Sequence, residues 1–132
     1  MANDPGEDLA PELRAFIHTF IESIEQVELL MLLRGSDRPR TAREIAAALR
    51  VSPGAARHDV ETLAARGLLE IRVGEETGYR YRPRSEELGR YCDLLAQHYI
   101  VARQAVLGYI AATGRLSIKR FADAFKLRDP EP

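Results

Sequence analysis

Residues 44–70 read EIAAALRVSPGAARHDVETLAARGLLE, and this stretch decides the fold. Thr41 precedes this stretch and lies three positions before Glu44, its first residue, which is the spacing of a capping box at the start of a helix. The apolar residues that follow recur at helical intervals. The pattern therefore predicts a helix over residues 41–50, whose buried face is formed by Ala42, Ile45, Ala46 and Leu49.

A second helix start follows after a short turn. Ser52 offers a hydroxyl that accepts from the free N–H groups of a first helical turn, and Pro53 supplies the fixed φ that suits the first helical position. Gly67 marks the other end, because glycine readily adopts the left-handed conformation that ends many helices. We therefore predict a helix over residues 53–66 that crosses the preceding one steeply and turns Ala56, Val60 and Leu63 inward.

A β-hairpin is predicted immediately after this pair of helices. The run LLEIRV (68–73) alternates apolar with charged residues, and the run YRYRP (79–83) alternates tyrosine with arginine. The segment between them, GEETG (74–78), has a glycine at each end. Two alternating runs around a glycine-bearing turn are typical of two antiparallel strands, which we expect over residues 68–83.

The order helix, short turn, helix, hairpin resembles the winged helix-turn-helix of the MarR-like and ArsR-like regulators. The residues that carry the resemblance are Ala46, Leu49, Val51, Ser52, Val60, Leu63, Gly67 and Leu68. The likeness covers about half of the chain, and it implies a fold rather than an activity. The whole chain also resembles uncharacterised bacterial winged-helix proteins, through SIEQVELLMLLR (23–34) and a FADAF motif (121–125). That second likeness implies the architecture only.

Helical extensions are predicted on both sides of this motif. Residues 1–8 are polar and are expected to be disordered, and a helix with a strong apolar stripe begins near Pro11. A second helix is predicted from Ser23, with Gln26 completing a capping box, and residues 27–33 are apolar enough to form the centre of the core. The expected fold is mainly α with a small β-hairpin, a winged helix-turn-helix with N- and C-terminal helical extensions. Its parts are a disordered tail (1–8), an N-terminal helix plus winged helix-turn-helix (9–84), and a C-terminal helical dimerisation extension (85–128).

The C-terminal extension contains one long helical pattern, from Glu86 to about Thr113, and Ser117 is expected to cap a short last helix. Apolar residues of the long pattern alternate steps of four and three, as in a coiled-coil seam. The seam fits either the chain's own N-terminal helix or a second subunit. Because further apolar residues lie off the seam, we predict a homodimer, with Phe16 and Phe20 as additional candidates for its interface. The seam consists of Leu88, Cys92, Leu95, Tyr99, Ala102, Val106 and Tyr109, and all of these except Cys92 are predicted interface residues.

Charge is unevenly distributed along the chain. The net charge of the 132 residues is −1, but residues 1–37 carry −6, residues 38–84 carry +4 and residues 85–132 carry +1. A basic surface attracts a polyanion, and in DNA-binding winged helices the second helix of the motif enters the major groove. Arg57 and His58 are then candidates for base contacts, and the arginines of the hairpin are candidates for phosphate contacts. The predicted DNA-binding residues are Arg43, Ser52, Arg57, His58, Arg72, Arg80 and Arg82.

The function that the sequence favours is a homodimeric transcriptional regulator whose partner is double-stranded DNA with a two-fold operator. Asp59 and Glu61 argue against it, because carboxylates on or beside the reading face repel phosphate. These carboxylates, the acidic N-terminal segment, and Tyr79 and Tyr81, if exposed, favour an adaptor that binds another protein and no DNA. A third alternative is a ligand-sensing regulator with a pocket between the long helix and the motif.

Other classes of function lack their motifs. The sequence has no Gly-rich phosphate loop, nucleophile elbow or paired-carboxylate cluster, so no enzymatic activity is predicted. His18, His58 and His98 are not paired at metal-ligand spacing, and we expect no metal and no cofactor. Cys92, the single cysteine, is expected to be a buried, inert thiol, the alternative being a redox sensor across a dimer axis. No apolar run approaches the roughly 20 residues of a membrane span, and no signal-peptide core is seen, so we expect a cytoplasmic protein without a membrane partner.

Overall fold

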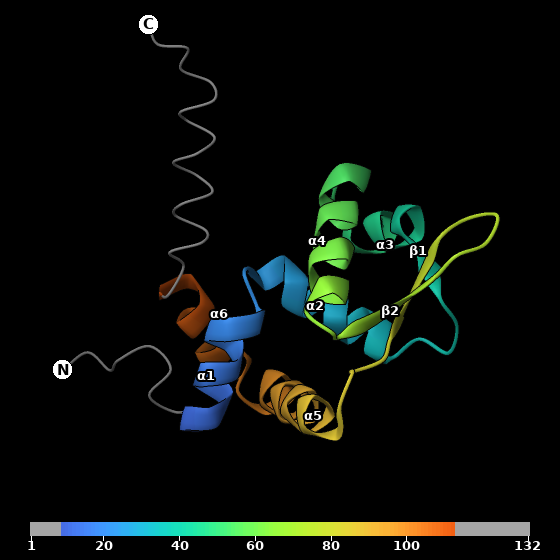
Figure 1. The fold of residues 1–132 in the computed structure, drawn as a ribbon. Coiled ribbons are helices and arrows are strands. Elements are labelled where there is room, and N and C mark those ends of the chain that lie inside the picture. The colour runs from blue at the N-terminus through green and yellow to red at the C-terminus, as the bar shows by residue number, and fades with distance from the viewer. Residues whose placement is uncertain (1–8, 113–132) are drawn as a thin grey trace, which may run out of the picture.

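The computed structural model describes residues 9–112, which form a mainly helical fold with a small antiparallel sheet (Figure 1). The predicted tail (1–8) and the predicted last helix with its FADAF motif lie outside these residues. The elements are, in order, α1 (Pro11–Phe20), α2 (Ile24–Arg34), β1 (Arg40–Thr41), α3 (Ala42–Leu49), α4 (Pro53–Ala65), β2 (Leu69–Arg72), β3 (Gly78–Tyr81), α5 (Glu86–Val101) and α6 (Arg103–Ala112).

The predicted helix-turn-helix is present as α3 and α4. Thr41 Oγ1 accepts from the Glu44 N–H at 3.1 Å and Glu44 Oε1 accepts from the Thr41 N–H at 3.0 Å, so the capping box is complete. Ser52 Oγ accepts from the Ala55 N–H at 3.1 Å and caps α4. Arg50, in the turn between the helices, has a φ of 60°, and this left-handed conformation costs a non-glycine residue about 1–2 kcal/mol. The geometry of the turn therefore overrides the preference of arginine for a negative φ.

The predicted hairpin is present, and it belongs to a sheet with a third strand that the sequence pattern did not indicate. In the hairpin, Leu69 of β2 lies opposite Tyr81 of β3. β1 pairs with the other edge of β3, so the strand order is β1-β3-β2. Gly78 permits this pairing, because a Cβ at its position would lie only 2.9 Å from the Cβ of Pro39. A strand of two residues shows no alternation of its own, which is why periodicity misses it.

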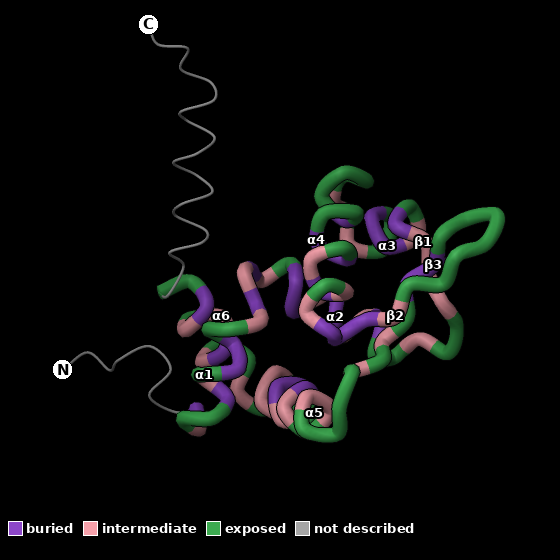
Figure 2. The backbone as a smooth tube through the Cα atoms, in the orientation of Figure 1, coloured by how far each residue is buried: buried purple, intermediate pink, exposed green. Residues whose placement is uncertain are grey.

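The hairpin, called the wing below, extends beyond the helices that cover its base (Figures 1 and 2). Tyr79 is buried and Tyr81 is half-buried, so neither is the exposed aromatic that would have favoured an adaptor. Ile71 and Val73, in contrast, are 46% and 87% exposed. The predicted alternation between buried and exposed residues therefore fails toward the turn, where no helix covers the sheet.

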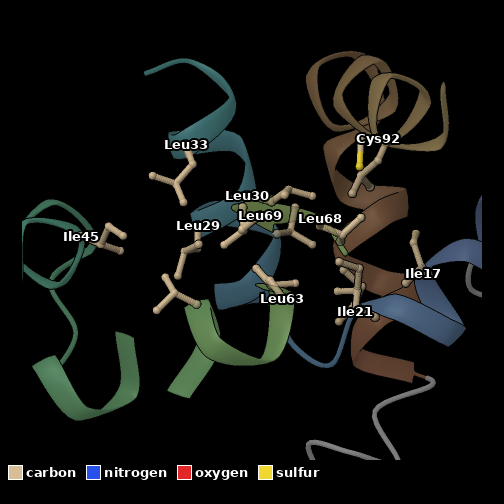
Figure 3. Close-up of a cluster of buried hydrophobic side chains, with 14 of the residues drawn as sticks. Ile17, Ile21, Leu29, Leu30, Leu33, Ile45, Leu63, Leu68, Leu69 and Cys92 are labelled. Carbon is tan, nitrogen blue, oxygen red and sulfur yellow. The ribbon is translucent and has the colours of Figure 1, made fainter. Parts of the chain in front are cut away.

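Helix α2 lies at the centre of the fold and contacts α3, α4, α6 and β3. Leu29, Leu30 and Leu33 are at most 1% exposed, and Figure 3 shows them among apolar side chains of α3, α4 and β2. Met31 and Leu32 are only half-buried. The prediction that residues 27–33 form the centre of the core is confirmed, although the helix is not covered on every side.

Buried polar contacts tie the beginning of α2 to α4. Ser23 caps α2 as predicted, accepting from the Gln26 N–H at 3.2 Å. The Gln26 side chain does not complete the capping box: its Oε1 accepts from the Glu22 N–H at 2.8 Å, and its Nε2 donates to Asp59 Oδ1 of α4 at 3.1 Å. Arg66, which follows α4, donates to Glu22 at 2.7 Å. The junction between α1 and α2 is thus joined to α4 at two points.

The prediction of one helix over residues 86–113 is wrong, because the chain breaks at Ala102, which has φ −137° and ψ 48°. The change of direction brings α6 against α1 and α2 (Figure 1). Arg103, the first residue of α6, lies 3.6 Å from the Glu28 carboxylate of α2, and its guanidinium lies over the ring of Tyr99, 5.3 Å from the centroid. Contacts within the chain therefore hold α6 in place.

The break also changes the predicted seam. Cys92, Leu95 and Val106 have no exposed surface and belong to the chain's own core. For Leu95 and Val106 the predicted role in a dimer interface is therefore corrected, since neither offers any surface to a second subunit. The other predicted interface residues, Leu88, Tyr99, Ala102 and Tyr109, are half-buried. Among the described residues, large exposed apolar side chains at this end of the molecule are Ile100 (80%) and Val101 (75%), beside the break.

Candidate nucleic-acid interface

One face of α4 is exposed, and the other packs in the core. Ala56 and Val60 are fully buried, and Arg57 and His58 lie on the exposed face, as predicted. Glu61, one turn after Arg57, is exposed as well. The exposed face therefore offers a guanidinium, an imidazole and a carboxylate to solvent or to a ligand.

Asp59 does not share that face, and its predicted position on or beside the reading surface is wrong. It is 6% exposed, and its carboxylate accepts from Gln26 Nε2 of α2. At 100° per residue, position 59 lies within about 60° of the buried positions 56 and 63. The helical angle alone indicated this inward direction. Only Glu61 of the two carboxylates remains as a source of repulsion toward phosphate.

A hollow of about 460 Å³ lies between the beginning of α3, the middle of α4 and the wing. It brings two predicted DNA-binding residues together, Arg43 from α3 and Arg57 from α4. Arg43 Nη2 lies 2.8 Å from Glu76 Oε2 of the wing turn, so its charge is neutralised by an ion pair that spans 33 positions. The lining residues are Thr41, Ala42, Arg43, Arg57, Glu61, Glu76, Thr77 and Tyr79.

Glu76 is a residue of this surface that the sequence interpretation missed. The segment GEETG was treated only as a turn, although its two carboxylates follow a strand with a candidate phosphate contact. Carboxylates in such a turn are a signal that a neighbouring arginine has an ion-pair partner within the chain. The position of the wing in the fold determines which arginine pairs with the carboxylate.

The remaining predicted residues are distributed over the wing and the turn. Arg72 is exposed and lies 3.5 Å from the Glu70 carboxylate, and Arg80 is exposed on the neighbouring strand, opposite Glu70 in register. Ser52 is exposed, but its hydroxyl is used as the cap of α4. Arg82 lines a separate hollow of about 300 Å³ at the base of the wing, beside the C-terminal end of α4. The structure therefore does not bring Arg82 to the surface shared by Arg43 and Arg57.

Cys92, on α5, has no exposed surface and belongs to the apolar core (Figure 3). Burial raises the pKa of its thiol to about 11, with the Tyr81 hydroxyl as a hydrogen-bond partner that opposes the shift. Thiolate is therefore scarce at neutral pH, which favours the inert thiol over a redox sensor. Within residues 9–112, no group of three or more His, Cys, Asp or Glu side chains is placed to hold a metal ion. None of the described helices has the length and apolarity that crossing a bilayer requires.

No protein-family model matches the chain, and no curated protein matches it in sequence. Solved structures do match. The homodimeric winged helix-turn-helix DNA-binding domain of a possible ArsR-family transcriptional regulator from Mycobacterium bovis is similar over 79% of this chain and 92% of its own, with 24% identity and a TM-score of 0.51. A MarR-family transcriptional regulator from Rhodococcus sp. RHA1 is similar over 90% of this chain and 84% of its own, with 16% identity and a TM-score of 0.54.

A third similar structure is MepR, a transcription regulator of the Staphylococcus aureus multidrug efflux pump MepA. It is similar over 88% of this chain and 84% of its own, with 13% identity and a TM-score of 0.53. At these identities the likeness concerns the fold, and a shared fold leaves the site to be argued from its own residues. With α3, α4 and the wing in their observed order, the chain has a winged helix-turn-helix fold, structurally similar to that of ArsR-family and MarR-family transcriptional regulators.

Proposed function

We propose that this protein is a DNA-binding transcriptional regulator that acts as a homodimer on a two-fold operator. The observation that carries the proposal is the exposed face of α4, where Arg57 and His58 face outward while the opposite side packs on the core. A recognition helix enters the major groove in this way, with side chains of its outward face at the base edges. Arg57 suits a bidentate contact with guanine, and His58 suits a base or a phosphate.

Phosphate contacts are assigned to the basic residues around this face. Arg72 and Arg80 extend from the wing into solvent, and the beginning of α4 is the positive end of its helix dipole, which favours an anion. Arg43 belongs to the same set once it exchanges Glu76 for a phosphate oxygen. Arg82 adds positive charge away from the outer face of α4, because it lies beside the C-terminal end of that helix.

The homodimer is supported by apolar surface near the end of α5. Exposed, adjacent apolar side chains such as Ile100 and Val101 are costly in water unless a partner covers them. A two-fold dimer buries the same surface on both copies, and it presents two recognition helices to a two-fold DNA site. The matched domain from Mycobacterium bovis is homodimeric, which is a precedent for the assembly in this fold.

The experiment is a titration of the protein with duplex DNA at two salt concentrations, first with random-sequence duplex and then with DNA from around its own gene. Wild-type protein is expected to bind both at low salt and to lose affinity as salt rises, because binding releases counterions. Arg57→Ala should cost about 1–3 kcal/mol on the preferred duplex and relax preference at one position. Arg82→Ala is the matched control, since it removes the same charge away from the outer face of α4.

No affinity for any duplex at low salt, where nonspecific binding is strongest, would contradict the proposal. That result would leave the adaptor, whose partner is another protein. Of the three observations that favoured an adaptor, two are weakened, because Asp59 and Tyr79 are both buried, and the acidic N-terminal segment remains.

A further inference from the structure

The hollow between α3, α4 and the wing contains four charged side chains, and only two of them neutralise each other. Arg43 and Glu76 form an ion pair across it. Arg57 and Glu61 line the same hollow, are exposed, and form no ion pair within residues 9–112. Within the hollow, the Arg57 guanidinium therefore remains available as a donor and the Glu61 carboxylate as an acceptor.

Arg57 and Glu61 are four residues apart, so they follow each other along one side of the helix. Side chains at this spacing are separated by roughly 6 Å along the helix axis. Successive base pairs are about 3.4 Å apart, so two such side chains in a major groove reach bases one or two steps from each other. The pair thus has the dimensions to contact neighbouring base pairs rather than a single one.

A carboxylate in a major groove is selective because it only accepts hydrogen bonds. Phosphate oxygens repel it, and thymine and guanine present acceptors or a methyl group in that groove. Adenine has an amino donor beside the N7 acceptor, which repels the second carboxylate oxygen. Cytosine presents its N4 amino group as the donor, with no neighbouring acceptor on the same base. A carboxylate brought to base edges therefore favours cytosine and is left unsatisfied at other bases.

We infer that Glu61 is a specificity-determining residue that accepts from the N4 amino group of cytosine, while Arg57 contacts a guanine one or two base pairs away. The inference rests on the proposed function and adds to it a preference for a G·C-rich half-site. Arg57, in the same hollow, offsets part of the repulsion between Glu61 and the phosphates. Glu61, which by its charge alone opposes DNA binding, thereby restricts the sequences that are bound.

The test is a selection from a randomised double-stranded DNA library with the full chain, carried out for the wild type and for Glu61→Gln. The wild type should enrich cytosine at one half-site position by roughly tenfold or more over the other bases. Glu61→Gln should replace that preference with adenine at the same position, because a glutamine amide matches the N6 and N7 groups of adenine. The guanine position assigned to Arg57 should stay unchanged in this variant.

Glu75→Gln is the matched control, because Glu75 is an exposed carboxylate of the wing turn that does not line the hollow. It should leave every base preference unchanged and raise the affinity for all duplexes slightly. Equal effects of Glu61→Gln and Glu75→Gln, with unchanged base preferences, would show that Glu61 only repels phosphate, and would overturn the inference while the regulator stands. A wild type that enriches no sequence and binds no duplex at low salt would overturn the proposed function together with the inference.

Discussion

Asp59 offers a direct test of how α4 is oriented in the fold. Asp59 is 6% exposed, its carboxylate accepts from Gln26 Nε2 at 3.1 Å, and Gln26 itself has no exposed surface. Asp59→Ala removes the charged acceptor and leaves a buried amide donor without this partner. We therefore expect a loss of folding stability, although Asp59 is an acidic residue in a helix that we assign to DNA binding.

The size of the effect follows from that contact. Hydrogen bonds to charged groups contribute about 1.5–3 kcal/mol, and an unsatisfied buried donor costs a similar amount. A loss of about 2–3 kcal/mol is a large share of the roughly 5–15 kcal/mol by which a domain is stable. The assay is urea unfolding followed by circular dichroism, in which the midpoint should fall while the slope of the transition stays the same.

Glu61→Ala is the control, since it removes an exposed carboxylate two positions away and should change stability by no more than about 0.5 kcal/mol. Asp59→Asn is expected to lie between the two, because it keeps the shape and one acceptor. Equal midpoints for Asp59→Ala and Glu61→Ala would refute this orientation of α4, with Asp59 facing the core. So would a variant Asp59→Ala that keeps its stability and binds DNA more tightly than the wild type.

Two further predictions concern α5, one from its exposed end and one from its buried thiol. Replacing Ile100 and Val101 together by aspartate should lower the mass measured by light scattering from dimer to monomer without changing the circular dichroism spectrum, because both side chains are exposed within the protomer. An unchanged dimer mass for the variant with aspartate at positions 100 and 101 would count against the proposed interface. Leu95→Asp should instead unfold the chain, since this side chain is fully buried. The thiol of Cys92 should react with a disulfide reagent only after denaturation, because burial raises its pKa from about 9 to about 11. This shift favours the protonated thiol in the fold, so its contribution to stability is fully present below pH 9 and is lost as pH rises toward 11. Rapid labelling of the native protein at pH 8 would contradict that assignment.

Local signals in the sequence were sufficient for the elements of the helix-turn-helix. Thr41 with Glu44, and Ser52 with Ala55, satisfy backbone groups no more than three residues away. Gly67 has a φ of +87°, which glycine adopts without steric cost. The inward direction of Asp59 was also available from its helical angle. These features depend on neighbours within one turn, and the sequence contains all of those neighbours side by side.

Only the tertiary structure decided the features that depend on distant contacts. Ala102 has a high helix propensity, so nothing local predicts the break there, and the packing of α6 on α1 and α2 overrides that propensity. Gln26 meets Asp59, and Arg43 meets Glu76, each pair across 33 positions of sequence. Charge and periodicity specify which residues are able to pair, but the position of α2 against α4 and of the wing against α3 determines which of them do.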